Sequence, residues 1–255
     1  MEKTCIIKQP AGIGDILFCQ KIAKIIQQET EYKKVIWPVS EQYAYLNDYL
    51  VSDGIEFPNV NENFPLKEVY LQKNFYMIEE KNYLYVPLDY SSYVLTKCSC
   101  HNNPRAHGHI KYNYCEASYE NWEDYFSIIR NFEKEDGLIK KLGLNDNEPF
   151  NLINSNCGTY PNHLTTHRIK PNNSYKNVEM SFQEGYTIFD WMGVFERAKE
   201  IHTMECGVYY ILQKLKLDNV FIYSKYTSEW DDGMNRTDDF SYMKDHCNQN
   251  WSYIN

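Results

Sequence analysis

A glycine turn near the N-terminus, Gly12-Ile13-Gly14-Asp15, constrains the fold of this chain more than any other feature. The apolar run Cys5-Ile6-Ile7 before it is typical of a buried strand, and apolar residues recur at helical spacing over residues 16–28 after it. A strand, a Gly-x-Gly turn and a helix start form the edge of a nucleotide-binding type of domain, because backbone N–H groups there can meet an anion. Leu17 replaces the third glycine of the dinucleotide fingerprint. The turn therefore delivers one carboxylate, Asp15, at a helix N-terminus.

Size and composition exclude several classes of protein. The 255 residues fit one large domain or two small α/β domains, and a hydrophobic fraction of 43% is ample for a core. A net charge of -9 argues against a nucleic-acid partner, whose binding needs a basic stripe. No apolar run approaches the ~20 residues of a membrane span, and the N-terminus lacks the apolar core of a signal peptide. We therefore expect a cytoplasmic protein with no membrane span and with reduced cysteines.

Short apolar runs alternate with helical patterns in the first half of the chain. Beyond the first strand and helix, we predict strands over residues 34–39, 55–57, 68–71 and 83–88 and a short helix over residues 43–50. The polar segment Cys98–Cys115 predicts a long loop, and an apolar stripe predicts a helix over residues 119–142. This order is typical of a mainly parallel sheet.

The second half restarts the same order after the turn-rich residues 145–149, which we interpret as the domain boundary. Strands are predicted over residues 150–154, 178–180, 200–203 and 220–223, and helices over residues 187–198 and 205–215. The simplest architecture is therefore α/β, with two Rossmann-like domains, residues 1–145 and 146–255, facing a cleft.

Two stretches together resemble heptosyltransferase-like glycosyltransferases, which have the GT-B fold. One is Gly12-Ile13-Gly14-Asp15-Ile16-Leu17, and the other runs from Phe189-Asp190-Trp191 to Gly207, where an acidic–small–glycine turn precedes a helix. The resemblance covers the ends of the two half-domains. It implies transfer of a sugar from a nucleotide-sugar donor, held by residues 146–255, to a hydroxyl of a glycan or other acceptor on residues 1–145. Neither a metal nor a cofactor is implied, and the C-terminal tail is expected to pack back on the first domain.

The resemblance also assigns roles to residues. Asp15 matches the base that deprotonates the acceptor hydroxyl. The C-terminal turn, which approaches the donor phosphates and sugar, maps onto Thr203, Glu205 and Gly207, with Cys206 between the last two. The family usually has Asp-Thr-Gly or Asp-Ser at this turn, so the sugar contacts of the family need not transfer to this chain.

A polar loop follows the strand predicted over residues 150–154. It would face the cleft, because ligands bind at the carboxyl ends of parallel strands. The loop carries four donor-binding candidates, Asn156, Gly158, Arg168 and Lys170. Its two cations and its glycine suit a diphosphate, and Gly14 of the first turn completes the predicted donor-binding set. The competing interpretation is a solvated surface loop.

The two acidic candidates and the cysteine-rich segment each allow a second interpretation. Asp15 has the position of an ordinary N-cap, and Glu205 that of a first-turn acid favoured by the helix dipole. The segment Cys98–Cys115 holds six potential zinc ligands, but its Cys-x-Cys and His-x-His spacings do not match the common finger pattern.

For the whole chain we predict an inverting, metal-independent glycosyltransferase of hexosyl or pentosyl type. Two further functions are compatible with the sequence. One is a nucleotide-sugar epimerase or hydrolase of the same fold, and the second is a non-catalytic nucleotide- or partner-binding module.

Overall fold

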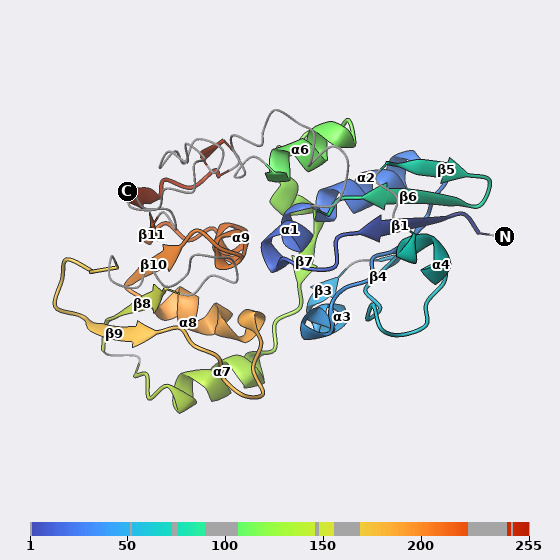
Figure 1. Cartoon of the computed structure of the whole chain (residues 1–255). Coiled ribbons are helices and arrows are strands. Elements are labelled where there is room, and N and C mark those ends of the chain that lie inside the picture. Colours follow the sequence, from blue (N-terminus) through green and yellow to red (C-terminus); the bar gives the residue numbers. More distant parts are fainter. Residues whose placement is uncertain are drawn as a thin grey trace, which may run out of the picture. The chain divides into compact units, whose positions relative to one another are not determined.

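The structure is a computed structural model, and it describes residues 2–51, 53–72, 76–89, 107–145, 148–155, 169–223, 244–245 and 247–254. The chain divides into two compact units, Met1–Ile129 and Arg130–Asn255 (Figure 1). This division lies earlier in the chain than the boundary expected between residues 145 and 146. The reason is helix α7 (Phe132–Lys141), which packs on helices of the second unit.

The first unit is built on a five-stranded sheet in the order β4-β2-β1-β6-β5. The strands are β1 (Thr4–Lys8), β2 (Lys34–Ile36), β4 (Ile55–Glu56), β5 (Ile78–Glu80) and β6 (Tyr83–Pro87). Neighbouring strands are parallel except β5 and β6, which are antiparallel. A separate antiparallel pair joins β3 (Leu50–Val51) to β7 (Ser127–Ile128). The apolar runs predicted as strands around β1, β2, β4 and β6 are confirmed.

Short helices complete the first unit. They are α1 (Ile13–Phe18), α2 (Gln20–Glu29), η1 (Glu41–Tyr43), α3 (Leu46–Tyr49), α4 (Lys67–Leu71), α6 (His107–Tyr114) and η4 (Trp122–Tyr125). The helix predicted over residues 16–28 is therefore present as two helices, which are separated at Cys19.

Two further predictions for this unit are wrong. Residues 68–71 form helix α4 instead of a strand, and Tyr70 of this helix packs in one cluster with Ile6 and Tyr85 of the sheet. A short apolar run does not distinguish a strand from a buried helical turn, so packing decides. The segment Cys98–Cys115, predicted as a loop, contains helix α6, although its first residues lie outside the described part of the chain.

The single helix predicted over residues 119–142 is also wrong. Asn121 has a φ of 52° and Phe126 is extended, so the helical stretch between them is limited to η4. Strand β7 follows, and the backbone N–H of Ile129 donates to the carbonyl of Tyr49 at 2.7 Å. The apolar stripe is thus shared by a 3-10 helix, a strand and helix α7.

The second unit is built on a five-stranded sheet in the order β12-β11-β10-β8-β9. Its strands are β8 (Phe150–Asn154), β9 (Lys176–Glu179), β10 (Glu200–Met204), β11 (Val220–Tyr223) and β12 (Ser252–Ile254). All neighbouring strands in this sheet are parallel. The four strands predicted in this half are confirmed.

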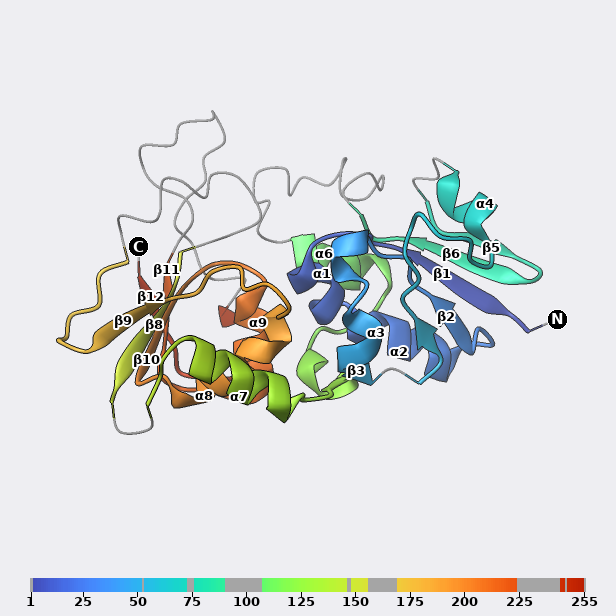
Figure 2. The same ribbon diagram turned by 90° about the horizontal axis from the view of Figure 1, so that it is seen from below.

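The helices of the second unit lie on one side of this sheet in Figure 2. Besides α7 they are η6 (Ile188–Trp191), α8 (Met192–Arg197) and α9 (Val208–Leu215). A capping box between Thr187 and Asp190 starts η6, so the helix predicted over residues 187–198 begins as expected.

The C-terminal residues end in the second sheet. Strand β12 pairs with β11, and the indole N–H of Trp251 donates to the carbonyl of Leu217 at 2.5 Å. The ring of Trp251 also meets Tyr209 of helix α9 edge-on, at 5.1 Å between centroids. The tail expected to pack back on the first domain therefore has its last part in the second unit, while residues 224–243 lie outside the described part.

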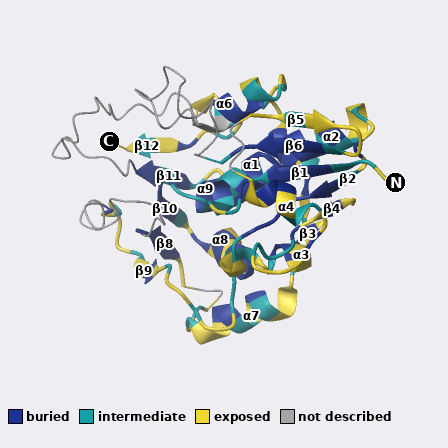
Figure 3. Ribbon diagram, turned by 45° about the vertical axis from the view of Figure 1, so that its right-hand side comes forward, coloured by how far each residue is buried: buried dark blue, intermediate teal, exposed yellow. Residues whose placement is uncertain are grey.

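In both sheets the connections reverse direction beside the first strand. Strand β1 lies between β2 and β6, and strand β8 lies between β9 and β10. These central strands are largely buried (Figure 3). Such a switch point opens a crevice at the carboxyl ends of the strands, where ligands bind in parallel sheets. The predicted α/β fold class, with two units on mainly parallel sheets, is confirmed, and it places the expected ligand positions after β1 and β6 and after β8 and β10.

Candidate functional site

The turn after β1 places Asp15 at the carboxyl edge of the first sheet. Gly12 has a φ of 85°, in the left-handed region that favours glycine. A Cβ atom at Gly12 would lie 2.8 Å from Oδ2 of Asp15. Glycine at position 12 therefore permits both the reversal of the chain and the close approach of the carboxylate.

Asp15 does not cap helix α1. Gly12 is the N-cap residue of this helix, Asp15 lies in the first turn, and no side chain makes a capping hydrogen bond. The interpretation of Asp15 as an ordinary N-cap is therefore wrong. Its carboxylate instead forms an ion pair with Lys111 of helix α6, with Oδ1 2.6 Å from Nζ.

Lys111 is a buried cation, with 1% of its side chain exposed. Its ammonium donates to Oδ1 of Asp15 at 2.6 Å and to Oε1 of Gln9 at 2.8 Å. A buried charge needs such partners, because it has lost the stabilisation that water provides. The Asp15 side chain, in contrast, is 22% exposed. The pair thus joins a buried cation to an accessible anion.

Aromatic packing holds helix α6 next to α1. The side chain of Tyr112, the residue after Lys111, is fully buried, and its hydroxyl donates to the carbonyl of Phe18. The ring of Phe18 meets Tyr112 at 4.9 Å and Trp122 at 5.3 Å between centroids, both edge-on. These contacts fix the backbone that carries Lys111 beside the glycine turn.

Sequence reasoning does not find Lys111. It lies 96 positions from Asp15 in the chain, and its surroundings predict a polar loop rather than a helix. The local signal is weak: Lys111 stands between the apolar residues Ile110 and Tyr112, both of which are buried. Only the fold brings this lysine to the turn.

Three cysteines of the first unit are described, of which Cys5 and Cys19 are buried and Cys115 is partly buried. Burial raises the pKa of Cys19 and that of Cys115 to about 12, and it also raises the pKa of Cys5. Thiols with such pKa values stay protonated at neutral pH, so they are poor nucleophiles. None of the three is therefore a candidate catalytic residue.

The segment Cys98–Cys115, with its six potential zinc ligands, is described only in part. Cys98, Cys100 and His101 lie outside the described residues, and the structure gives only the backbone of His107. The ring of His109 stacks on Tyr119 at 4.1 Å between centroids. Among the side chains that are described, no group of three could hold a metal. Zinc binding by this segment therefore stays an alternative interpretation of the sequence.

Neutral polar side chains gather at the carboxyl ends of β8 and β10 in the second unit. The amide of Asn154 donates to Oγ1 of Thr203 at 2.9 Å and lies 3.2 Å from Sγ of Cys206. The hydroxyl of Thr203 donates to the carbonyl of Met204 at 3.0 Å. Two predicted donor-binding residues, Thr203 and Cys206, are thus joined by Asn154, which sequence reasoning does not select.

Glu205 and Gly207 lie in the turn between β10 and α9. The backbone N–H of Glu205 donates to the carbonyl of Tyr223 at 3.1 Å, and the Glu205 side chain is buried. Helix α9 begins at Val208 with Gly207 as its N-cap, later than the predicted start at residue 205. Glu205 therefore precedes the helix, and its interpretation as a first-turn acid is wrong.

The loop predicted to bind a diphosphate is mostly outside the described part of the chain. Asn156, Gly158 and Arg168 belong to that undescribed stretch, whereas Lys170 is described and exposed. Gly14 is buried in the first turn of α1. The donor-binding role of these residues stays a prediction.

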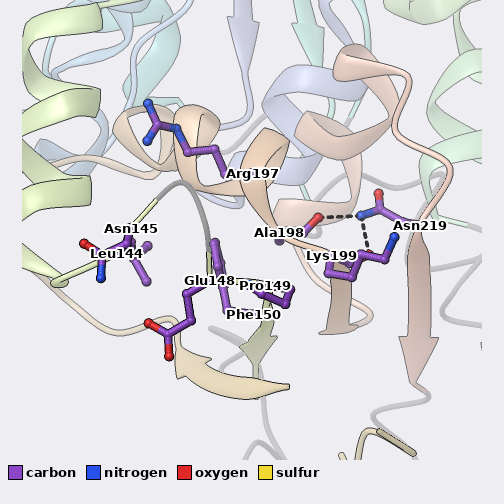
Figure 4. Close-up of a pocket in the computed structure, with 9 residues that line it drawn as sticks. All are labelled: Leu144, Asn145, Glu148, Pro149, Phe150, Arg197, Ala198, Lys199 and Asn219. Carbon is purple, nitrogen blue, oxygen red and sulfur yellow. Dashed lines mark hydrogen bonds between the residues drawn. The ribbon is translucent and has the colours of Figure 1, made fainter. Parts of the chain in front are cut away.

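A surface hollow of about 520 Å³ lies at the other edge of the second sheet (Figure 4). It is lined by Leu144, Asn145, Glu148, Pro149, Phe150, Arg197, Ala198, Lys199 and Asn219. These residues lie at or before the amino ends of β8, β10 and β11, whereas ligands in parallel sheets bind at the carboxyl ends. Asn219 donates to the carbonyls of Ala198 and Lys199 at 2.8 and 3.0 Å, which ties the two loops together. None of the predicted site residues that the structure describes lines this hollow.

Strand β10 also carries a buried histidine, which sequence reasoning does not identify. Nδ1 of His202 lies 3.0 Å from the hydroxyl of Tyr223, and Nε2 lies 2.9 Å from Oε2 of Glu200. The ring stacks on Phe221 at 4.6 Å between centroids. Burial lowers the pKa of His202, and the Glu200 carboxylate partly opposes this change. Because both ring nitrogens are engaged inside the protein, neither is left for a substrate.

Neither a protein-family model nor a curated protein sequence matches this chain. A solved structure described as that of the glycosyl transferase family 9 from Veillonella parvula DSM 2008 is similar to it, with a TM-score of 0.48 and 9% sequence identity. The alignment covers 88% of this chain and 81% of the other. Similarity at this level does not transfer chemistry, so the function of this chain depends on its own side chains. None of the described helices has the length and apolar character that crossing a membrane requires.

Proposed function

We propose that this chain is an inverting glycosyltransferase that moves a sugar from a nucleotide-sugar donor to an acceptor hydroxyl without a metal. The observation that carries the proposal is the state of the Asp15 carboxylate. It stands at the carboxyl end of the central strand β1, it is partly exposed, and only one of its oxygens is bound to Lys111. No described residue hydrogen-bonds to Oδ2 of Asp15. In the proposed mechanism this oxygen receives the proton of the acceptor hydroxyl.

A carboxylate in this state suits general-base chemistry. Asp15 takes the proton of the acceptor hydroxyl while the hydroxyl oxygen attacks the anomeric carbon of the donor sugar. The bond between that carbon and the diphosphate oxygen breaks, and its electron pair leaves with the nucleoside diphosphate. Attack from the face opposite the leaving group inverts the anomeric centre. The positioned base contributes on the order of 10²–10⁴-fold to the rate.

The second unit is the proposed donor site, and the first unit the proposed acceptor site. Asn154, Thr203 and Cys206 place neutral polar groups where ligands of a parallel sheet bind. A diphosphate leaving group also needs positive charge, and Lys170 and Arg168 are the proposed sources. Glu205 and Gly207 border the same turn, and Asn156 and Gly158 complete the proposed donor contacts of this unit. Gly14, which belongs to the first unit, stays a predicted donor contact.

The test compares Asp15→Asn with a matched control. Asp48→Asn removes an exposed carboxylate from helix α3 of the same unit. We expect Asp15→Asn to lower transfer on the order of 10²–10⁴-fold with donor binding kept, while Asp48→Asn stays at the wild-type rate. Donor binding is measured by the thermal shift with nucleoside diphosphates and nucleotide sugars, since ligand at about a hundred times its Kd adds roughly 2.7 kcal/mol.

Different outcomes would point to different functions. Full transfer by Asp15→Asn contradicts the role of Asp15 as base. Consumption of donor without an acceptor indicates a nucleotide-sugar hydrolase or epimerase. The absence of any thermal shift with these nucleotides favours a non-catalytic binding module. A loss of transfer in chelator that added metal restores would contradict metal independence.

A further inference from the structure

We infer that Lys111 is a positioning residue for Asp15, which fixes Oδ1 so that Oδ2 is the oxygen that receives the acceptor proton. This inference rests on the proposed function, in which Asp15 is the general base. Its structural basis is a carboxylate that is confined on two sides, by a buried ammonium and by the backbone of the glycine turn.

The first side is the ammonium of Lys111. With 1% of its side chain exposed, it cannot turn to water for its hydrogen bonds. It lies 2.6 Å from Oδ1 of Asp15 and 2.8 Å from Oε1 of Gln9, the residue that follows strand β1. Hydrogen bonds between charged groups are short and strong, so the pair holds the carboxylate in one orientation.

The second side is Gly12. A Cβ atom there would stand 2.8 Å from Oδ2 of Asp15, closer than real Cβ contacts come. The backbone of the turn thus lies directly beside the oxygen that Lys111 leaves unbound. Rotation of the carboxylate is limited from both directions, and Oδ2 has no hydrogen-bond partner among the described residues.

The helix that carries Lys111 is packed against helix α1. Tyr112, its neighbour on helix α6, is fully buried and hydrogen-bonded to the carbonyl of Phe18 on helix α1. The same helix α1 carries Asp15. Base and positioning residue are therefore joined through adjacent residues of two packed helices. A base held in this way spends little time in unproductive orientations, and errors near 1 Å in such geometry cost about 10²-fold in rate.

The test is Lys111→Met, which keeps most of the side-chain volume and removes the charge. We expect kcat for transfer to fall on the order of 10²-fold, with KM for the donor and the thermal shift with nucleoside diphosphate unchanged. Lys21→Met is the matched control. Lys21 is also a buried lysine of the first unit, but it donates to the carbonyl of Glu120 and lies over the ring of Tyr125. Lys21→Met should lower the melting temperature and leave kcat at the wild-type value.

A double-mutant cycle separates positioning from an independent role. If Lys111 acts through Asp15, adding Lys111→Met to Asp15→Asn causes no further fall in kcat. The double variant should also melt higher than Asp15→Asn alone, because the single variant leaves a buried ammonium without its anion. Losses in kcat that multiply would overturn the inference, since Lys111 would then act without Asp15.

The outcomes also distinguish this inference from the proposed function. If Asp15→Asn is inactive and Lys111→Met is fully active, the inference fails and the proposed base stands. If Asp15→Asn is fully active, the proposed mechanism fails whatever Lys111→Met does. A fall in kcat for Lys21→Met equal to that for Lys111→Met would mean that any buried lysine of this unit has the same effect, and the inference would also fail.

Discussion

The Arg130 ion-pair network of the second unit and the Lys111–Asp15 pair of the first unit both bury charge, but they engage their carboxylates differently. Arg130 uses both oxygens of each partner. It reaches Oε1 of Glu135 at 2.9 Å and also binds Oε2, and it meets Oε1 and Oε2 of Glu196 at 2.6 and 2.7 Å. Lys111 engages one oxygen of Asp15. In the Arg130 network both oxygens of each carboxylate are bonded to the arginine. In the Lys111–Asp15 pair, one carboxylate oxygen has no hydrogen bond to a described residue.

This difference separates a structural carboxylate from the proposed base. The Glu135 side chain is 3% exposed and packs against Gly193 of helix α8, where a Cβ atom would lie 2.9 Å from Oε2. It can take no proton from a substrate, because no substrate reaches it. Asp15 has 22% of its side chain exposed and stands at a strand end where ligands bind. Exposure and incomplete hydrogen bonding together, rather than charge alone, are the features that favour Asp15 as the proposed base.

The largest expected effect on stability comes from Arg130→Gln. It leaves the Glu135 carboxylate buried without its cation, which lowers the free energy of unfolding by about 3–5 kcal/mol. Glu56→Gln is the control, since its pair with Lys34 is partly exposed and should contribute about 1 kcal/mol or less. Urea denaturation measures both. Transfer by folded Arg130→Gln should keep the wild-type kcat. Equal losses of stability in the two variants would contradict the structural role of Arg130 as the partner of the buried Glu135 carboxylate.

Gly12→Ala tests the open side of the Asp15 carboxylate. Gly12 and Gly185 have φ values of 85° and 86°, so alanine at either position costs about 1–2 kcal/mol of backbone strain. Only at Gly12 does the new Cβ meet Oδ2 of Asp15, whereas nothing lies within 4 Å at Gly185. We expect kcat to fall on the order of 10²-fold in Gly12→Ala and to stay unchanged in Gly185→Ala. If both variants lose only stability, the position of Oδ2 does not matter for transfer.

Much of the fold could be predicted from local patterns. The short runs that form β1 and β8 each contain three apolar residues, and the glycine turn after β1 marks the start of the first helix. The predictions are wrong where the local sequence fits two kinds of secondary structure equally well and tertiary packing decides between them. Val69 and Tyr70 suit a strand as well as a helix, and only their packing against the sheet makes α4 helical. The stripe over residues 119–142 is interrupted by the positive φ of Asn121, which asparagine tolerates but does not require.

At the candidate site, the sequence predicts only the residues that belong to a motif or lie at the end of a predicted strand. Asp15 belongs to a recognisable turn, Thr203 ends a predicted strand, and Cys206 follows that strand. Lys111 and Asn154 complete these two groups from segments 96 and 49 positions away. A partner at that distance leaves no periodic or spacing signal, because only tertiary packing brings it close: helix α6 against α1 for Lys111, and strand pairing for Asn154. The sequence therefore identifies one half of each interaction.

Thr203→Val extends the comparison to the neutral groups of the second unit. The substitution keeps the shape of the side chain and removes the hydroxyl that accepts from Asn154 at 2.9 Å. If this group holds the donor, we expect Kd for the nucleotide sugar to rise by about tenfold, which corresponds to about 1.4 kcal/mol, with kcat little changed. The control is Thr30→Val. It removes a hydroxyl that donates to the carbonyl of Ile26 at the end of helix α2, and it should leave Kd unchanged. Equal Kd values for both variants would remove Thr203 from the donor site.

The smallest expected effect concerns His202, a buried base with both nitrogens engaged. Burial lowers its pKa below the ordinary value of 6.5, which the unfolded chain keeps. As the pH falls below about 6.5, the unfolded state binds more protons than the folded state, so this contribution to stability is present above that pH and is lost at lower pH. We expect the urea midpoint of the wild type to decline between about pH 7 and pH 5 more than that of His202→Gln, which has no imidazole to protonate. Parallel pH profiles for the two proteins would show that His202 titrates alike in both states, and its engaged nitrogens would then not distinguish it from an exposed histidine.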